Sequence, residues 1–401
     1  MKFNYRSVPI GELCQGIYDG PHATPAPSDS GAIFLGISNF VNGKLNLSPS
    51  SIRYISEEDY PKWTKRVTPK AHDIVFSYEA TLNLYAIIPD GFHGCLGRRM
   101  ALMRPDEDVV DYRFLYYHMF SPAWREEIER YKVNGSTVDR IPLVSFPSFR
   151  VDLPDMRTQK AIADILFAID QKIDSNSKVN DNLQQQAELL YHERFETVDR
   201  DKLPVGWRIV RLGDVATISK KSFNPAKEPE MLLEHYSIPA FDEAHFPVFE
   251  PSTAIKSNKF IVDDSCFMIS KLNPTTKRVW KPYCLTENAV CSTEFIVYKA
   301  KSQEITDFLY SVIDSASFSD FMCSHVTGST GSRQRTTPSD TLAFELVLPN
   351  AEEIAEYQGI VSPMFEQIKC NATENDRLKR LRDSLLPKLM SGEIDVSGIQ
   401  L

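Results

Sequence analysis

The chain repeats itself in order, with an offset of about 200 residues. Residues 5–13 and residues 207–215 both run aromatic, arginine, one variable residue, valine, one variable residue, aliphatic, glycine, acid, aliphatic. Two further matches follow in the same order: residues 135–142 with 331–338, which share Gly-Ser and a proline, and residues 151–154 with 346–349, which share an apolar stretch ending in proline. Chance matches do not keep their order over three segments, so the chain is a tandem duplication.

Each copy ends in a segment that is predicted to be one long helix. Asp155 and Asn350 are the expected N-caps, and Glu353 lies in the capping-box position of the second helix. Apolar residues recur in both segments at heptad spacing, in two rows three and four residues apart, which predicts a coiled-coil seam. The seam residues are Ile162, Leu166, Ile169, Ile173, Asn176, Asn180, Leu183 and Leu190 in the first helix, and Val361, Met364, Ile368, Asn371, Asn375, Leu378 and Leu385 in the second.

The middle of the seam is polar in both helices. Asn176 and Asn180 interrupt the first helix's rows at the place where Asn371 and Asn375 interrupt the second helix's rows. Rows of apolar residues occur in any amphipathic helix, and that remains the alternative. Buried asparagine fixes helix register at a cost in stability, so the matched interruption favours two helices that pair antiparallel, with the asparagines meeting near the midpoint. Pro363 is expected to interrupt the second helix early and to kink it.

The rest of the sequence predicts an α+β fold: two mixed α/β domains, separated by the two antiparallel helices as a coiled-coil spacer and related as a pseudo-twofold tandem duplication. Strands are expected at 32–37, 73–76 and 295–298, and helices at 112–129 and 304–314. The predicted divisions are residues 1–152 (first domain), 153–200 (central spacer helix), 201–347 (second domain), 348–395 (distal spacer helix) and 396–401 (C-terminal tail).

Composition indicates where such a chain works. It has 42% hydrophobic and 25% charged residues, as ordinary soluble globular proteins do, and no apolar run approaches the roughly 18 residues of a membrane span. Seven scattered cysteines form no disulfide framework and fit a reducing cytoplasm. The formal net charge of -9 argues mildly against nucleic-acid binding, although a whole-chain sum hides local basic patches.

Motifs for catalysis are missing from the sequence. It has no Gly-x4-Gly-Lys-Ser/Thr phosphate loop, no Gly-x-Gly-x-x-Gly, and no Asn/Asp-Pro-Pro-aromatic loop of an adenine methyltransferase. His93 and Cys95 lie close together without zinc-ligand spacing. Residues 170–172 resemble part of a nuclease motif, but they lie on the first long helix, where solvated charge is expected. We therefore expect no catalytic residue, no metal site and no cofactor on this chain.

Several motifs resemble the DNA-specificity subunits of type I restriction–modification systems. The resemblance to target-recognition domains is carried in the first copy by residues 19–25, 34–39, 73–77 and 95–100, and in the second, as another variant, by residues 223–225, 236–241, 270–274 and 289–295. Residues 381–394 resemble the family's distal helix. The resemblance covers nearly the whole chain, and the order of the motifs together with the duplication makes it specific.

The resemblance implies a recognition subunit that binds double-stranded DNA at a bipartite, asymmetric target. It implies assembly with two methyltransferase subunits, joined by two motor-nuclease restriction subunits when the complex cuts. S-adenosylmethionine for adenine methylation and ATP for cleavage would be bound by those partners. The helix from Ile162 to Arg194 would be roughly 50 Å long, at about 1.5 Å per residue, and would act as a ruler for the unread gap.

Residues that contact DNA are expected in basic, polar loops, because base edges are read by hydrogen bonds and phosphates by Lys and Arg. The candidates are His22, Ser77, Tyr78, Glu79, Arg98 and Arg99 in the first domain, and Lys271, Asn273, Lys277, Arg278, Arg333, Gln334 and Arg335 in the second. For each of them a solvated surface position is the alternative. Three alternatives for the whole chain stay open: a self-sufficient methyltransferase or nuclease, a coiled-coil interaction module without a DNA role, and the specificity subunit of a related restriction system.

Overall fold

The computed structural model describes residues 5–133, 138–327 and 334–396. The chain divides into two compact units: a first unit of residues 1–172 and 378–401, and a second unit of residues 173–377. Each unit therefore combines one globular half of the chain with segments of both long helices. The division into residues 1–152, 153–200, 201–347, 348–395 and 396–401 stays a prediction.

The first unit is built on a four-stranded antiparallel sheet with strand order β2-β10-β7-β8. Its strands are β1 (Arg6–Pro9), β2 (Cys14–Asp19), β3 (Ala32–Leu35), β4 (Phe40–Val41), β5 (Lys44–Leu45), β6 (Arg53–Ile55), β7 (Ile74–Ser77), β8 (Tyr85–Ile87), β9 (Gly94–Leu96), β10 (Met100–Pro105) and β11 (Arg150–Leu153). Its short helices are α1 (Tyr60–Trp63), α2 (Tyr112–His118) and α3 (Pro122–Tyr131), with 3-10 turns at Ile10–Leu13, Ile37–Asn39 and Phe146–Ser148. A second sheet has the order β6-β3-β9, and β1 pairs with β11.

The second unit repeats this plan with a sheet of order β13-β21-β18-β19. Its strands are β12 (Arg208–Arg211), β13 (Ala216–Ser219), β14 (Ser222–Phe223), β15 (Leu232–Tyr236), β16 (Val248–Pro251), β17 (Lys259–Ile261), β18 (Cys266–Ser270), β19 (Val279–Trp280), β20 (Ala289–Ser292), β21 (Phe295–Ala300), β22 (Val326–Thr327), β23 (Arg335–Thr336) and β24 (Glu345–Leu348). Its short helices are α5 (Leu212–Val215), α6 (Ile238–Ala244), α7 (Thr306–Asp314), α8 (Ala316–Ser324) and α9 (Pro338–Thr341); 3-10 turns lie at Pro225–Lys227, Ser252–Ala254 and Gln303–Ile305, and a π-helical turn at His192–Glu196.

The two topologies match strand for strand where the sequence repeats. The outer pair β1–β11 corresponds to β12–β24, and the parallel pair β3–β9 corresponds to the parallel pair β15–β20. The second sheets differ, because the β3–β9 pair belongs to a three-stranded sheet and the β15–β20 pair to a five-stranded one. The mixed fold, the tandem duplication and the long helices confirm the predicted fold class.

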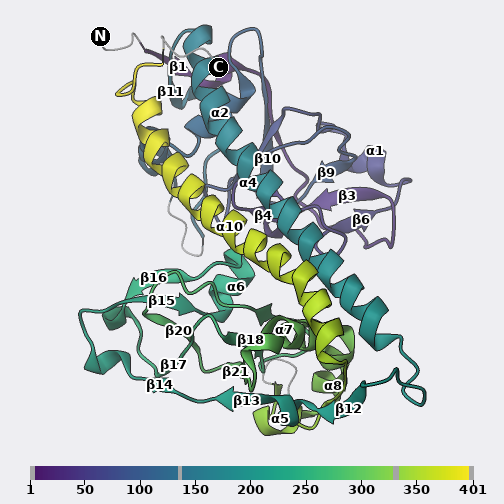
Figure 1. The fold of residues 1–401 in the computed structure, drawn as a ribbon. Helices are drawn as coiled ribbons and strands as arrows, with labels where there is room; N and C mark the ends of the chain where they lie inside the picture. The colour runs from purple at the N-terminus through teal and green to yellow at the C-terminus, as the bar shows by residue number, and fades with distance from the viewer. Residues whose placement is uncertain (1–4, 134–137, 328–333, 397–401) are drawn as a thin grey trace. The chain divides into compact units, whose positions relative to one another are not determined.

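Two long helices, α4 (Met156–Tyr191) and α10 (Ala351–Met390), contribute to both units (Figure 1). In the second unit Asn176 donates to Asn375 at 2.9 Å and Asn371 donates to Asn180 at 2.8 Å. Because the partner's number falls as the residue number rises, the helices run antiparallel. In the first unit Asp170 pairs with Arg382, which continues the same register.

Each globular core takes in the start of one long helix and the end of the other. Ile162 and Leu166 join the first core together with Leu386 and Met390. At the equivalent positions of the duplication, Tyr357, Val361, Tyr191 and Phe195 join the second core. Burial of these side chains is what ties the long helices to each domain, at roughly 1.5–3 kcal/mol for each large apolar side chain.

Two helix predictions were wrong. The single helix expected at 112–129 is broken into α2 and α3, because Pro122 starts a new helix and the Ser121 hydroxyl caps it by accepting from the Trp124 amide at 3.2 Å. The expected interruption at Pro363 is not there, since α10 is one helix through that residue. Pro363 is exposed, while Val361 and Phe365 beside it are buried, and their packing outweighs the lost backbone hydrogen bond.

Candidate nucleic-acid interface

The nominated residues of the first unit gather at one edge of its four-stranded sheet. Strand β2 ends at Asp19, β7 ends at Ser77, and β10, which lies between them, begins at Met100. Met100 pairs with Ser77 and Ala101 pairs with Asp19, so the three loops at these strand ends lie at the same edge. These loops carry His22, Tyr78, Glu79, Arg98 and Arg99, with Ser77 at the strand end itself.

Asp19 is the centre of this edge. One oxygen of its carboxylate, Oδ2, accepts from His22 Nε2 at 2.7 Å and from Arg66 Nη1 at 3.1 Å. Arg66 also donates to the carbonyl of Gly20 at 2.9 Å and remains half exposed. We did not nominate Asp19 or Arg66 from the sequence; the adjacent basic pair Lys65-Arg66 is the same kind of signal that singled out residues 277–278.

Tyr78 is buried against this carboxylate, with 6% of its surface exposed. Burial raises the pKa of Tyr78, and the charge of Asp19 raises it further. The Tyr78 hydroxyl and the other oxygen of Asp19, Oδ1, are both buried, and a side-chain hydrogen bond to Asp19 contributes to the raised pKa of Tyr78. Buried polar groups usually have such partners, so the contact with Tyr78 helps to hold Asp19 in place at this edge.

The neighbouring loops are also unusual in their backbone. Ala80, Asn83 and Arg99 all have positive φ, at 72°, 63° and 69°, and side chains other than glycine reach this region only at a cost. Gly20 is needed there, because a Cβ atom at this position would lie 2.6 Å from the carbonyl oxygen of Gly97. Sparsely populated backbone conformations of this kind cluster at functional sites.

The nominated residues at this edge differ in accessibility. Arg98 is exposed, and Arg99 is half-buried with its Nε 3.4 Å from Glu79. Ser77 is fully buried, and its hydroxyl donates to the backbone carbonyl of Thr81. Ser77 therefore supports the loop from beneath, while the arginines reach the surface.

The second unit brings its candidates to the equivalent edge. Strand β18 ends at Ser270 opposite Phe295, where β21 begins, as β7 and β10 meet in the first unit. The backbone amide of Asn273 donates to the carbonyl of Gln334 at 2.9 Å, which joins the two nominated loops. Asn273 has a φ of 48°, and its buried side-chain oxygen has no partner among the described residues. Arg333 lies outside the described residues.

The cations at this second edge are engaged within the unit. Arg278 forms a bidentate pair with Asp242 at 2.6 and 2.8 Å, Arg335 pairs with Glu294 at 3.0 and 3.1 Å, Lys271 donates to the carbonyl of Thr293 at 2.8 Å, and Lys277 pairs with Glu188 and Asp314. A phosphate contact by any of them requires an existing ion pair or hydrogen bond to be exchanged. The two edges therefore share a position in the fold but differ in how available their charges are.

Comparison with known proteins identifies the family. The family model described as the type I restriction modification DNA specificity domain matches residues 8–185. The chain is 24% identical to the type I restriction enzyme MjaIX specificity subunit of Methanocaldococcus jannaschii, over 89% of this chain and 83% of that protein. It is 23% identical to the HindI specificity subunit of Haemophilus influenzae, over 90% and 94% of the two chains. The chain is therefore similar, over most of its length, to type I restriction–modification specificity subunits.

The fold is that of a solved relative. A type I restriction–modification S subunit from M. genitalium matches this structure with a TM-score of 0.61, over 96% of both chains, at 15% sequence identity. At this identity the likeness supports the fold, and the residues that contact DNA must be argued from this specificity subunit itself.

The predicted seam of the specificity subunit is distributed as follows. Its buried members are Ile162, Leu166, Ile173, Asn176, Val361, Asn371 and Asn375; its half-buried members are Ile169, Asn180, Leu183, Leu190, Met364, Ile368, Leu378 and Leu385. The expectation of solvated charge was wrong for Asp170, which is 7% exposed. Asp170 accepts hydrogen bonds from Tyr117 and from Arg382, both at 2.7 Å, and these two partners replace the water that burial removes from its carboxylate.

Within the described ranges no three His, Cys, Asp or Glu side chains are grouped so that they could hold a metal ion. In the same ranges no helix has the length and apolar character needed to cross a membrane. The seven cysteines are free, and burial raises the pKa of Cys14, Cys95 and Cys266 to about 12, so these thiols stay protonated near neutral pH.

Proposed function

We propose that this specificity subunit reads a bipartite, asymmetric DNA target, one part with each globular half, and performs no chemistry itself. The observation that carries the proposal is the repeated sheet edge. The same strand ends present different side chains in the two halves: His22, Asp19, Arg66 and Arg98 in one, Lys271, Asn273 and Gln334 in the other. Equivalent surfaces with different hydrogen-bonding groups read different sequences, so an asymmetric target follows.

The partners follow from the family and from the charge. The subunit would act with two methyltransferase subunits, and with restriction subunits when the complex cuts; S-adenosylmethionine and ATP would be bound by those chains in the cytoplasm. A net charge of -9 gives this subunit little long-range attraction for DNA on its own. Basic partner surfaces would supply the phosphate contacts that it lacks.

The antiparallel helices would set the gap between the two parts of the target. Helix α4 has 36 residues and α10 has 40, and a helix rises about 1.5 Å per residue. The asparagine pairs fix the register of this pair in the second unit. A helix pair of fixed length and register would hold the gap constant while each half reads its own sequence.

Methylome sequencing tests the proposal. The chain is expressed in cells together with the methyltransferase encoded beside its gene, in a host without other adenine methylation. We expect one new methylated motif in two dissimilar parts, separated by a constant gap. Absence of new methylation, with both proteins verified as present and bound to each other, would favour a coiled-coil interaction module without a DNA role.

A further inference from the structure

Strand β19 is the edge strand of the second unit's four-stranded sheet, and a lysine lies near each of its ends. Its two residues, Val279 and Trp280, are both buried and pair with β18. Lys277 precedes the strand and Lys281 follows it directly. Both lysines are held in contacts that lead to the long helices.

Lys277 connects the loop before β19 to helix α4. Its Nζ contacts the carboxylate of Glu188 on α4, lies 3.0 Å from Oδ1 of Asp314, and donates to the carbonyl of Asp314 at 2.7 Å. Gln184, one turn before Glu188, donates to the other oxygen of Asp314 at 2.5 Å. Asp314 is the last residue of α7 and is 4% exposed, so it is a buried acid that depends on these partners.

Lys281 connects the same strand to helix α10. Its Nζ donates to Oδ1 of Asp307 at 2.5 Å, and Oδ2 of Asp307 accepts from the Ser362 hydroxyl of α10 at 2.5 Å. The Nζ of Lys281 also lies 5.5 Å from the ring centroid of Phe365, another residue of α10. Cations over aromatic rings at this distance are attracted to the ring face.

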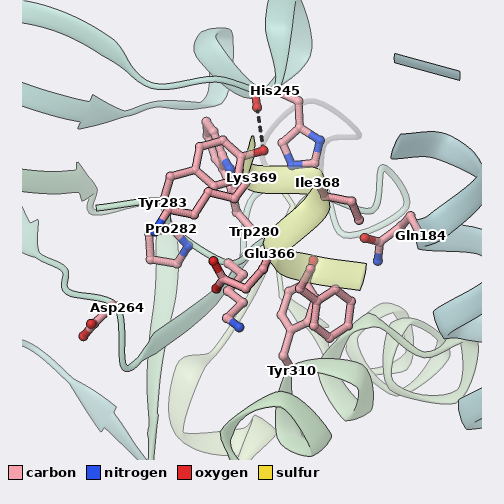
Figure 2. Close-up of a pocket in the computed structure, with 12 residues that line it drawn as sticks. Gln184, His245, Asp264, Trp280, Pro282, Tyr283, Tyr310, Glu366, Ile368 and Lys369 are labelled. Carbon is pink, nitrogen blue, oxygen red and sulfur yellow. Dashed lines mark hydrogen bonds between the residues drawn. The ribbon is translucent and has the colours of Figure 1, made fainter. Parts of the chain in front are cut away.

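An open pocket of about 200 Å³ lies between the domain and α10 (Figure 2). Gln184 and Tyr310 border it near the first connection, and Lys281 near the second, while Glu366 and Lys369 of α10 line it as well. The domain and α10 do not pack continuously at this opening. The polar connections therefore add to the alignment that the buried apolar side chains of α10 provide in the second core.

We propose that Lys277 and Lys281 are positioning residues that fix the second recognition domain on the long helices, rather than phosphate contacts. This inference rests on the proposed function, because what the alignment serves is the constant gap between the two parts of the target. Loosening either connection lets the domain tolerate targets with a gap one base pair too long or too short. The sequence read by the domain itself stays unchanged.

The effects of Lys277→Met and Glu188→Gln on DNA binding have the same sign if Lys277 is a positioning residue and opposite signs if it contacts phosphate. If Lys277 is a positioning residue, Lys277→Met and Glu188→Gln both break the connection and act in the same direction. If Lys277 instead contacts phosphate, Glu188→Gln frees its charge and strengthens DNA binding, while Lys277→Met weakens binding. Lys277→Arg keeps the charge and serves as the conservative control.

The experiment measures binding of the chain in complex with its methyltransferase to the methylome-derived target and to versions with the gap changed by one base pair. We expect each single variant to lower the preference for the correct gap by about fivefold. The double variant should be no worse than Lys277→Met, and Lys277→Arg should retain the preference. The slope of log Kd against log salt should not change, whereas loss of one phosphate contact lowers it by about 0.9.

Tighter binding of Glu188→Gln, or a lower salt slope for Lys277→Met, would overturn the positioning role. Amide hydrogen exchange of the free chain keeps the two proposals distinguishable. Lys277→Met and Glu188→Gln should both speed exchange at the end of α7, and the double variant should speed it no further. If the wild-type protein binds no bipartite DNA but the two substitutions have non-additive effects on exchange, the proposed function fails and the contact between Lys277 and Glu188 stands. Additive effects on exchange would refute that contact.

Discussion

The two units secure the same kind of domain to the same pair of helices with different side chains. In the first unit the key contact is a carboxylate on α4, Asp170, which accepts from Tyr117 of the domain and from Arg382 of α10. In the second unit the key contacts are lysines of the domain, Lys277 and Lys281. The two units share the four-stranded sheet and the pair of long helices, but different side chains connect the domain to the helices.

One contact has been kept in both units. A glutamine of the adjoining long helix accepts from the backbone at the start of the equivalent short helix: Gln159 accepts from Asp111 at 2.9 Å, and Gln358 accepts from Asp307 and Phe308 at 3.1 Å. The second glutamine lies one turn further along its helix than the first. Because the helix start needs acceptors for its free amides, the role persists even where the residue has moved.

The difference between the units has a consequence at the two edges that we propose as the DNA contacts. In the first unit anchoring is done by α2 and the long helices, so Arg98 remains exposed at its edge. In the second unit Lys277 belongs to the anchor and Arg278 is 13% exposed in its pair with Asp242. The first edge is therefore better prepared for phosphate, and the second for contacts made by polar groups.

The largest expected effect on the free energy of unfolding is at the anchor of the first unit, the contact of Asp170 with Tyr117 and Arg382. Asp170→Ala should lower the free energy of unfolding by about 3 kcal/mol, because Arg382 and Tyr117 lose their buried partner. Urea unfolding of the free chain measures this. Asp383→Ala is the matched control, since Asp383 also pairs with Arg382 at 2.9 Å but is exposed; it should cost less than about 0.5 kcal/mol. Equal costs would show that the Asp170 anchor is not special.

The first unit contains a fully buried histidine, which should make its stability sensitive to acid. Burial lowers the pKa of His118 to about 4 from the ordinary 6.5. The stability contributed by its neutral ring is complete above pH 6.5 and is lost as the pH falls from 6.5 to about 4, up to about 3 kcal/mol.

His118→Phe should therefore flatten the pH dependence of unfolding between pH 6.5 and 4, as followed by urea titrations at several pH values. If His118→Phe leaves the slope as steep as in the wild type, His118 is not neutral when folded.

The asparagine layer, formed by Asn176, Asn180, Asn371 and Asn375, lies in the second unit. Replacing its members should show how much each amide pair contributes to the free energy of unfolding. Asn176→Leu should cost about 1–2 kcal/mol, because Asn375 loses the side-chain amide that donates to it. The double variant Asn176→Leu with Asn375→Leu should cost less than the sum of the single variants, since neither buried amide is left without its partner. Thermal unfolding of the four proteins measures this, and additive losses would contradict a shared polar contact.

The smallest expected effect compares the two edges that we propose as the DNA contacts. Arg98→Ala should lower the salt slope of DNA binding by the complex by about 0.9, as loss of one phosphate contact does. Arg278→Ala should change the slope less, because its charge is already matched by Asp242. A larger change for Arg278→Ala would reverse the proposed difference between the edges.

The sequence predicted what depends on short-range periodicity and on the repeat. The amino-acid sequence itself contains the seam asparagines and the motifs that recur about 200 residues apart. The duplication and the antiparallel helices could therefore be predicted. Contacts between residues far apart in the chain could not: Arg66 reaches Asp19, and Lys277 reaches Glu188, only once the sheet edges are formed. For the basic pair at 277–278 the sequence gives the charge but not the partners, so the DNA contact stays a prediction while the ion pairs of both residues could not be anticipated.

The most direct test of the account is methylome sequencing of two proteins, the wild type and a variant with one extra heptad in each long helix, inserted after residues 178 and 373, at the level of the asparagine layer. Seven residues add about 10 Å, or about three base pairs of duplex. The account predicts that both parts of the methylated motif stay the same while the gap between them grows by about three. A variant that methylates with an unchanged gap, or that reads different half-sites, would contradict it.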